Sequence, residues 1–349
     1  MGTGIVATAA VTLPFTNSLV QWFAYLVWLG AAVLLLGLIT ASIRQWLRHP
    51  ELARGHLTNP MMAQFYGAPP MALMTVGTGA LLVQKPLLGD SVSLGIAWSL
   101  WIIGTIGGLV TAVVVPYLLF TRHQVRKDGA FGGWLMPVVP PMVSAAGGAL
   151  LVPYAPAGAV RETMLYGCYA LFGLSLMAAF IIITLIWSRL AHFGSSGSAR
   201  VPTLWIVLGP LGQSITAAGA LGTNAKTAVE PQLAAAMDVF AIIYGVPVWG
   251  FAILWACLAT LLTLRARKQN MSFALTWWAF TFPVGTCVTG TSQLAFHTDL
   301  ITFKVAAMVA YLGLLLAWLL VLLRTTRGIF RGPLLTPAPL KQPPARKAE

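Results

Sequence analysis

Long apolar segments, each bounded by charged residues or by turn signals, follow one another along almost the whole chain. Apolar runs of about 20 residues are typical of transmembrane helices. We therefore predict an all-α integral membrane fold of ten transmembrane helices, the first of them unusually short. The approximate ranges are 2–13, 19–44, 60–84, 92–120, 132–153, 163–190, 202–222, 233–264, 272–295 and 301–324.

The third, fifth, seventh and ninth of these segments each contain a proline. The prolines are 71, 69 and 73 residues apart, and small residues recur seven positions after each of them. A proline removes one backbone hydrogen bond and kinks a helix, which lipid tolerates only where the freed carbonyl meets protein or water. A period near 70 made of two helices predicts five helical-hairpin repeats. The predicted helix-kink residues are Pro70, Pro141, Pro210 and Pro283.

The first repeat is incomplete. Its opening letters, MGTG, match Val76-Gly77-Thr78-Gly79 of the second repeat, but no proline precedes them. A helix from Gly2 to Pro14 covers only about 20 Å at ~1.5 Å per residue, short of the ~30 Å hydrocarbon core. We infer that the first helix lacks its cytoplasmic half, and we favour a start codon assigned downstream of the true one over a truly truncated chain.

Composition excludes a soluble globular protein. Hydrophobic residues make up 58% of the chain and charged residues 8%, against about 25% charged residues in soluble domains. The net charge of +13 does not indicate nucleic-acid binding, because 17 of the 21 Lys and Arg residues lie in loops after even-numbered helices or in the tail. That distribution predicts two cytoplasmic termini. It divides the chain into a transmembrane pore domain, 1–331, and a Pro-rich basic cytoplasmic tail, 332–349, which we expect to be disordered.

The proline-bearing segments contain no Asp, Glu, Lys or Arg, and one of them carries a mildly polar stripe. Helical geometry places Phe282, Thr286, Thr289 and Gln293 on one face of the ninth segment. A neutral pathway lined by hydroxyl and amide groups, with helix ends offering N–H groups, suits anions better than cations or proton relays. The alternative is that the prolines and small residues serve only tight helix packing. The predicted pore-lining residues are Thr3, Ser144, Gln213, Thr216, Thr286 and Thr289.

The residues alone leave two alternatives for each of two further side chains. Phe282, one residue before a predicted kink, is either a plug that closes the path or a core aromatic. Asp238, about two turns into the eighth helix, is either a coupling acid or an interfacial residue near a helix start, and we favour the second. His297, Asp299 and Lys304 read as solvated residues of an outer loop. The three cysteines show no metal-ligand spacing, so we predict no metal, no cofactor and no enzymatic activity.

Several stretches resemble the tellurite-resistance/dicarboxylate transporter family, which includes bacterial TehA-like proteins, the yeast malate permease, sulfite efflux pumps and the plant slow anion channels. They are MGTGIV at 1–6, HPE at 49–51, LWIVLGPLGQS at 204–214 and WWAFTFPVGT at 277–286. The resemblance implies five helical hairpins around a quasi-fivefold pore, with the odd helices inside, and a homotrimer with one pore per subunit. It also implies that Phe282, in the TFP motif, occludes the pore.

The expected function is a membrane anion channel or transporter that passes small anions, such as malate-like C4-dicarboxylates or sulfite, through a pore gated by Phe282. The alternative is a proton-coupled dicarboxylate carrier or sulfite efflux pump that uses Asp238 or an outer-loop acid. The expected partners are small inorganic or dicarboxylate anions and the lipid bilayer, without nucleic acid. We expect a multi-pass protein of the plasma membrane and a bacterial source.

Overall fold

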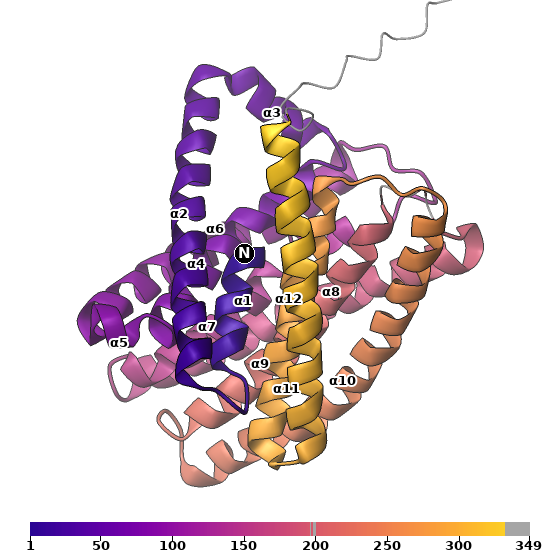
Figure 1. Ribbon diagram of the computed structural model, residues 1–349. Helices are drawn as coiled ribbons and strands as arrows, with labels where there is room; N and C mark the ends of the chain where they lie inside the picture. Colours follow the sequence, from indigo (N-terminus) through magenta and orange to yellow (C-terminus); the bar gives the residue numbers. More distant parts are fainter. Residues whose placement is uncertain (196, 198–199, 332–349) are drawn as a thin grey trace, which may run out of the picture.

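The computed structural model describes residues 1–195, 197 and 200–331, and the predicted tail at 332–349 lies outside them. Within this range the chain is helical and contains no strand (Figure 1). The α-helices are α1 (Gly2–Val11), α2 (Ser18–Arg48), α3 (Pro50–Thr58), α4 (Ala68–Leu82), α5 (Lys85–Leu88), α6 (Asp90–Thr121), α7 (Pro140–Leu151), α8 (Ala159–Phe193), α9 (Leu208–Ala225), α10 (Pro231–Lys268), α11 (Phe282–Thr298) and α12 (Ile301–Phe330). Short 3₁₀ segments are η1 (Ala63–Gly67), η2 (Gly132–Leu135), η3 (Val152–Tyr154), η4 (Val201–Val207) and η5 (Leu275–Phe280).

Six helical segments of the described chain are long and apolar enough to cross a membrane. They are α2, α6, α8, α10, α12 and the stretch Val201–Ala225, which joins η4 to α9. The all-helical membrane class predicted from the sequence is thereby confirmed. That the shorter helices complete a set of ten spans in five repeats stays a prediction.

The long helices α2, α6, α8, α10 and α12 each turn only one stripe toward the protein. In α12 the buried residues are Phe303, Ala307, Tyr311, Leu314, Trp318 and Val321, three or four positions apart. Side chains at this spacing lie on one face of a helix. The other faces carry large exposed apolar side chains, among them Leu312, Leu316 and Leu319, which is the surface expected of helices that meet lipid.

The short helices form the inside of the molecule. Every residue of α7 is buried except Leu150, and α9 and α11 are buried over most of their surfaces. Helix α1 contacts α4, α4 contacts α7, α7 contacts α9, α9 contacts α11, and α11 contacts α1 again. The contacts between these helices therefore close into a ring. Figure 1 shows α1 lying between α2 and α12, which cover this part of the ring.

The four prolines predicted to kink helices lie within the first three residues of α4, α7, α9 and α11. A 3₁₀ segment precedes each of these helices. Proline is accommodated in the first turn of an α-helix because its missing N–H has no partner within the helix there. The interruption predicted in these segments thus takes the form of a change in helix type at the proline.

Indole and phenol donors of the outer helices bind the inner helices. Trp28 of α2 donates to the carbonyl of Val76 at 2.9 Å, and Trp101 of α6 donates to that of Ser144 at 2.8 Å. Tyr311 of α12 donates to the carbonyl of Val6 at 3.2 Å. Buried Trp and Tyr side chains need such partners. These bonds fix the position of each inner helix relative to the outer helix beside it.

Candidate functional site

A cavity of about 450 Å³ lies where the inner helices begin. Apolar groups form most of its wall, and the hydroxyl-bearing residues around it are Thr3, Thr203, Thr276 and Thr325. No Asp, Glu, Lys, Arg or His side chain lines it among the described residues. The inner segments contribute Met1, Gly2, Thr3, Phe65, Ala68, Met71, Ala72, Val76, Met136, Val139, Thr203, Ile206, Gly209, Leu275, Thr276, Trp278, Ala279, Phe282 and Pro283. The outer helices α2 and α12 contribute Ala31, Leu34, Leu35, Leu38 and Thr325.

Phe282 is the first residue of α11 and lines this cavity. Its side chain is 4% exposed, so the ring is almost completely enclosed by protein. It belongs to the same buried apolar cluster as Ile5 of α1, Met71 of α4 and Val143 of α7. The structure thus places this ring in the wall of the cavity, among side chains from several inner helices.

A second cavity of about 520 Å³ lies at the opposite ends of the inner helices. It is lined by Leu81 and Leu82 at the end of α4, by Leu150 at the end of α7 and by Asn224 at the end of α9. Residues 210–223 of α9 line neither cavity. Buried side chains therefore separate the two cavities in this conformation.

Three of the predicted pore-lining threonines meet between α9 and α11. The hydroxyls of Thr216 and Thr289 are 2.7 Å apart and hydrogen-bonded. Thr286 is fully buried and donates to the carbonyl of Pro283 at 2.7 Å. A threonine hydroxyl still has acceptor capacity when it donates, but these groups are partly used in holding the two helices together.

The other predicted pore-lining residues differ in where their side chains lie and in what they bond to. Thr3 lines the first cavity and accepts a hydrogen bond from the Trp318 indole of α12 at 3.3 Å. The Ser144 hydroxyl is hydrogen-bonded to that of Thr105, so it is directed toward the outer helix α6. Gln213 is 7% exposed, and no described residue is hydrogen-bonded to its side-chain amide. Its amide is therefore the polar group of this buried layer that is most free to bind something else.

Thr203 and Thr276 also line the first cavity, although neither is among the pore-lining residues predicted from the sequence. Each lies seven residues before a repeat proline, Pro210 and Pro283 respectively. Comparing the residues seven positions before the repeat prolines, as was done seven positions after them, could have identified these two threonines. They belong to the 3₁₀ segments, where the side chains follow a different rotation per residue than in an α-helix.

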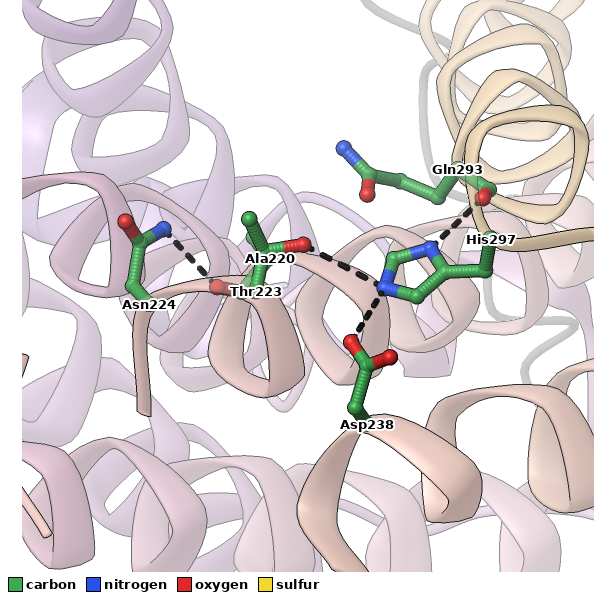
Figure 2. Close-up of polar contacts among 6 residues, drawn as sticks. All are labelled: Ala220, Thr223, Asn224, Asp238, Gln293 and His297. Atoms are coloured by element: carbon green, nitrogen blue, oxygen red, sulfur yellow. Dashed lines mark hydrogen bonds and ion pairs between the residues drawn. The ribbon is translucent and has the colours of Figure 1, made fainter. Parts of the chain in front are cut away.

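The interpretation of His297 as a solvated loop residue is wrong. Helix α11 continues to Thr298, and the His297 side chain is only 2% exposed. Its ring lies between the Gln293 carbonyl and the Asp238 carboxylate of α10, with Thr223 of α9 beside it (Figure 2). Asp238 is thus the partner of a buried histidine, and it does not cap α10, which begins seven residues earlier.

Helix ends supply the electrostatics of the first cavity. Helices α4, α9 and α11 all begin at residues close to or within its wall. The first N–H groups of α4 and α9 bond to the 3₁₀ segments before them, Ala68 to the Phe65 carbonyl and Leu208 to that of Ile206, but the helix dipole still places partial positive charge at these ends. An apolar cavity free of acidic groups, with several helix N-termini at its edge, favours a negatively charged or neutral occupant over a cation.

The comparison with known proteins agrees with this chemistry. Residues 1–326 match the family described as voltage-dependent anion channel. The chain is 27% identical over 343 residues to a sulfite efflux pump of Trichophyton rubrum, covering 95% of this chain and 90% of the pump. It is 25% identical over 345 residues to an uncharacterized transporter of Methanocaldococcus jannaschii, covering 96% and 94%.

A malic acid transport protein of Schizosaccharomyces pombe is 22% identical over 254 residues, which are 69% of this chain and 58% of that protein. The resemblance expected from the short motifs is therefore confirmed over nearly the full described chain. The chain belongs to the voltage-dependent anion channel family, a family of anion channels and transporters.

Proposed function

We propose that the protein conducts small anions across the membrane along the axis enclosed by α1, α4, α7, α9 and α11, and that Phe282 is the gate. The observation that supports this proposal is the cavity between the beginnings of the inner segments and the outer helices α2 and α12, which the buried Phe282 ring lines. In the proposed arrangement, five helical hairpins contribute one inner and one outer helix each. The outer helices face lipid, and the arginine-rich ends of α2 and α12 face the cytoplasm.

Sulfite and malate-like C4-dicarboxylates are the substrates that we propose, because similar proteins bear the names sulfite efflux pump and malic acid transport protein. Both are small oxyanions whose oxygens accept hydrogen bonds. The pathway offers hydroxyls and the Gln213 amide, which can donate, and the partial positive charge of helix N-termini. Donors without full positive charge bind an anion weakly enough to release it, as conduction requires.

Passage in this mechanism needs no covalent step. An anion enters the first cavity, loses part of its hydration shell, and waits against the Phe282 ring. Displacement of the ring opens a path past Gln213 and the Thr216–Thr289 pair toward the second cavity. Because the ring is apolar and tightly enclosed, it closes the path both by steric block and by excluding water. We further propose a homotrimer with one such pathway in each subunit.

Anion replacement in reconstituted planar bilayers tests the conduction. With sulfite or malate on one side and an impermeant anion on the other, we expect currents that reverse at the potential set by the permeant anion alone. Protein-containing bilayers that carry no current with sulfite, malate, chloride or nitrate would contradict the proposal. Bilayers formed with heat-unfolded protein provide the baseline.

The same preparation separates a channel from a proton-coupled carrier. For a permeant anion whose own charge does not change with pH, such as nitrate, a channel's reversal potential is indifferent to a transmembrane pH gradient, because no proton moves with the anion. A carrier that uses Asp238 shifts its reversal potential with the gradient, and Asp238→Asn removes that shift. We expect the reversal potential to stay constant when one side is moved from pH 7.5 to pH 6, and a shift would favour the carrier.

A further inference from the structure

We propose that His297 and Asp238 form a proton-binding site that clamps α11 to α9 and α10 at the far end of the inner helices, and that release of the proton favours the open gate. The first half of this inference stands on the geometry of the described residues alone. The second half rests on the proposed function.

The ring nitrogens of His297 both face oxygen atoms. Nδ1 lies 2.8 Å from the backbone carbonyl oxygen of Gln293, one turn earlier in α11. Nε2 lies 3.1 Å from Oδ1 of Asp238 and 3.2 Å from the hydroxyl of Thr223. Figure 2 shows the ring held between these groups, which come from three different helices. Only Asp238 of the pair reaches solvent, with its side chain 51% exposed against 2% for His297.

Asp238 is half exposed and therefore taken as an ionised carboxylate, and with that charge the contacts of both ring nitrogens are satisfied only by a ring with two N–H groups. A carbonyl oxygen and a carboxylate accept hydrogen bonds and cannot donate them. Each neutral form of the imidazole has one nitrogen without hydrogen. The lone pair of that nitrogen would face and repel an oxygen atom, either that of the Gln293 carbonyl or that of the Asp238 carboxylate. Thr223 can donate to Nε2, but the repulsion from Asp238 remains. A proton bound to His297 therefore makes the contact between α10 and α11 attractive, and its loss removes that attraction.

No other ionisable group of the described residues contacts His297. Asp299 follows α11 and is paired with Lys304 of α12, which keeps the pKa of the Asp299 carboxyl below its ordinary value through their hydrogen bond. On α8, Tyr169 has a buried hydroxyl without a partner among the described residues and feels the charge of Asp238. Lys226 and Glu230 lie in the short connection between α9 and α10. Asp238 is thus the carboxylate that His297 contacts.

The clamp joins α11 to a unit that is itself closely packed. A Cβ atom added at Gly222 of α9 would lie 2.9 Å from the Met237 carbonyl and 3.0 Å from the Asp238 Cα. The backbones of α9 and α10 therefore touch beside Asp238. His297 links the last turn of α11 to this unit by side chains alone, so this contact can open while the α9–α10 contact stays intact.

The proton site and the gate lie on one helix. Phe282 begins α11 and His297 lies in its last turn, with no break between them. At ~1.5 Å per residue the two are about 22 Å apart along the helix. Phe282, Gln293 and His297 also lie near the same face of α11. Since the clamp and the enclosed Phe282 ring occur together in this conformation, we assign the protonated clamp to the closed state.

The proton site is tested without any transport measurement. In protein labelled at the histidine ring, the signals missing from the His297→Gln spectrum identify His297. We expect an imidazolium with two N–H protons at pH 6, and a marked loss of that form in Asp238→Asn at the same pH. Asp299→Asn, which removes the neighbouring acid that His297 does not contact, should leave the signal unchanged. A neutral His297 ring at pH 6, or the same signal in Asp238→Asn, would overturn the inference.

The link to the gate is tested by conductance with equal pH on both sides of the bilayer. Loss of the proton from His297 releases the clamp, so wild-type conductance should rise by about fivefold or more from acidic to alkaline solution, the lower range of coupling between two sites. His297→Gln and Asp238→Asn should lose this pH dependence, and Asp299→Asn should keep it. A pH dependence that survives in His297→Gln would overturn the coupling. Absence of any current would refute the proposed function, while the ring spectra would still decide the proton site.

Discussion

Replacing Phe282 with alanine should raise the anion conductance of the reconstituted protein about tenfold or more, which corresponds to at least ~1.4 kcal/mol removed from the barrier to passage. The ring is 4% exposed and lines the first cavity. Truncation leaves space where the apolar plug was, and neighbouring hydroxyls can then hold water across the gap. Single-protein currents in sulfite or malate solutions measure the effect directly.

Phe280→Ala is the matched control for this experiment. Phe280 is also buried, at 9% exposure, but it packs between Trp205 and Trp277 and does not line the cavity. Both truncations remove a buried ring and should destabilise the protein by comparable amounts, about 3–5 kcal/mol. Only Phe282→Ala should increase the current. Equal currents in the two variants, both with an intact unfolding transition, would show that Phe282 is a packing residue.

The long-range organisation of the chain follows from local sequence patterns to a large extent. Apolar length marks the helices that meet lipid, and the prolines mark the beginnings of α4, α7, α9 and α11. Both patterns can be recognised because each depends on one segment alone and on whether lipid or protein surrounds it. A further periodic signal was available in the tryptophans. Trp28 and Trp101 are 73 residues apart, Trp249 and Trp318 are 69 apart, and each donates to an inner helix.

Which side chains of different helices bond to one another could not be predicted from the sequence. Ser144 lies in the expected register but its hydroxyl pairs with Thr105 on another helix, and no spacing along the chain reveals that choice. The prediction that His297 is a solvated loop residue is wrong because the predicted helix ends two residues before it. The helix instead continues until Asp299, whose backbone adopts the left-handed conformation at φ 55°. That extra turn places the ring inside the protein, where Asp238 of a different helix meets it.

Gly212→Ala should be strongly damaging, because α9 and α11 meet there backbone to backbone. An added Cβ would lie 2.4 Å from the Cys287 nitrogen and 2.4 Å from the Thr286 carbonyl carbon. Neither atom belongs to a flexible side chain, so the helices must separate. Close helix approach through glycine is the main source of affinity between helices in membranes, and overpacking of this kind costs about 1–3 kcal/mol or more.

Separation of α9 from α11 also affects the proposed pathway, since it pulls apart the hydrogen-bonded hydroxyls of Thr216 and Thr289 one turn away. We therefore expect Gly212→Ala to lower the thermal unfolding temperature in detergent and to disturb conduction at temperatures where the protein is still folded. Gly209→Ala is the control, because the nearest atoms to its added Cβ are those of the Pro283 ring at 3.9 Å, an ordinary contact distance. If both variants unfold at the wild-type temperature, α9 and α11 are not as closely apposed as this packing requires, and the ring of inner helices must be arranged differently at that position.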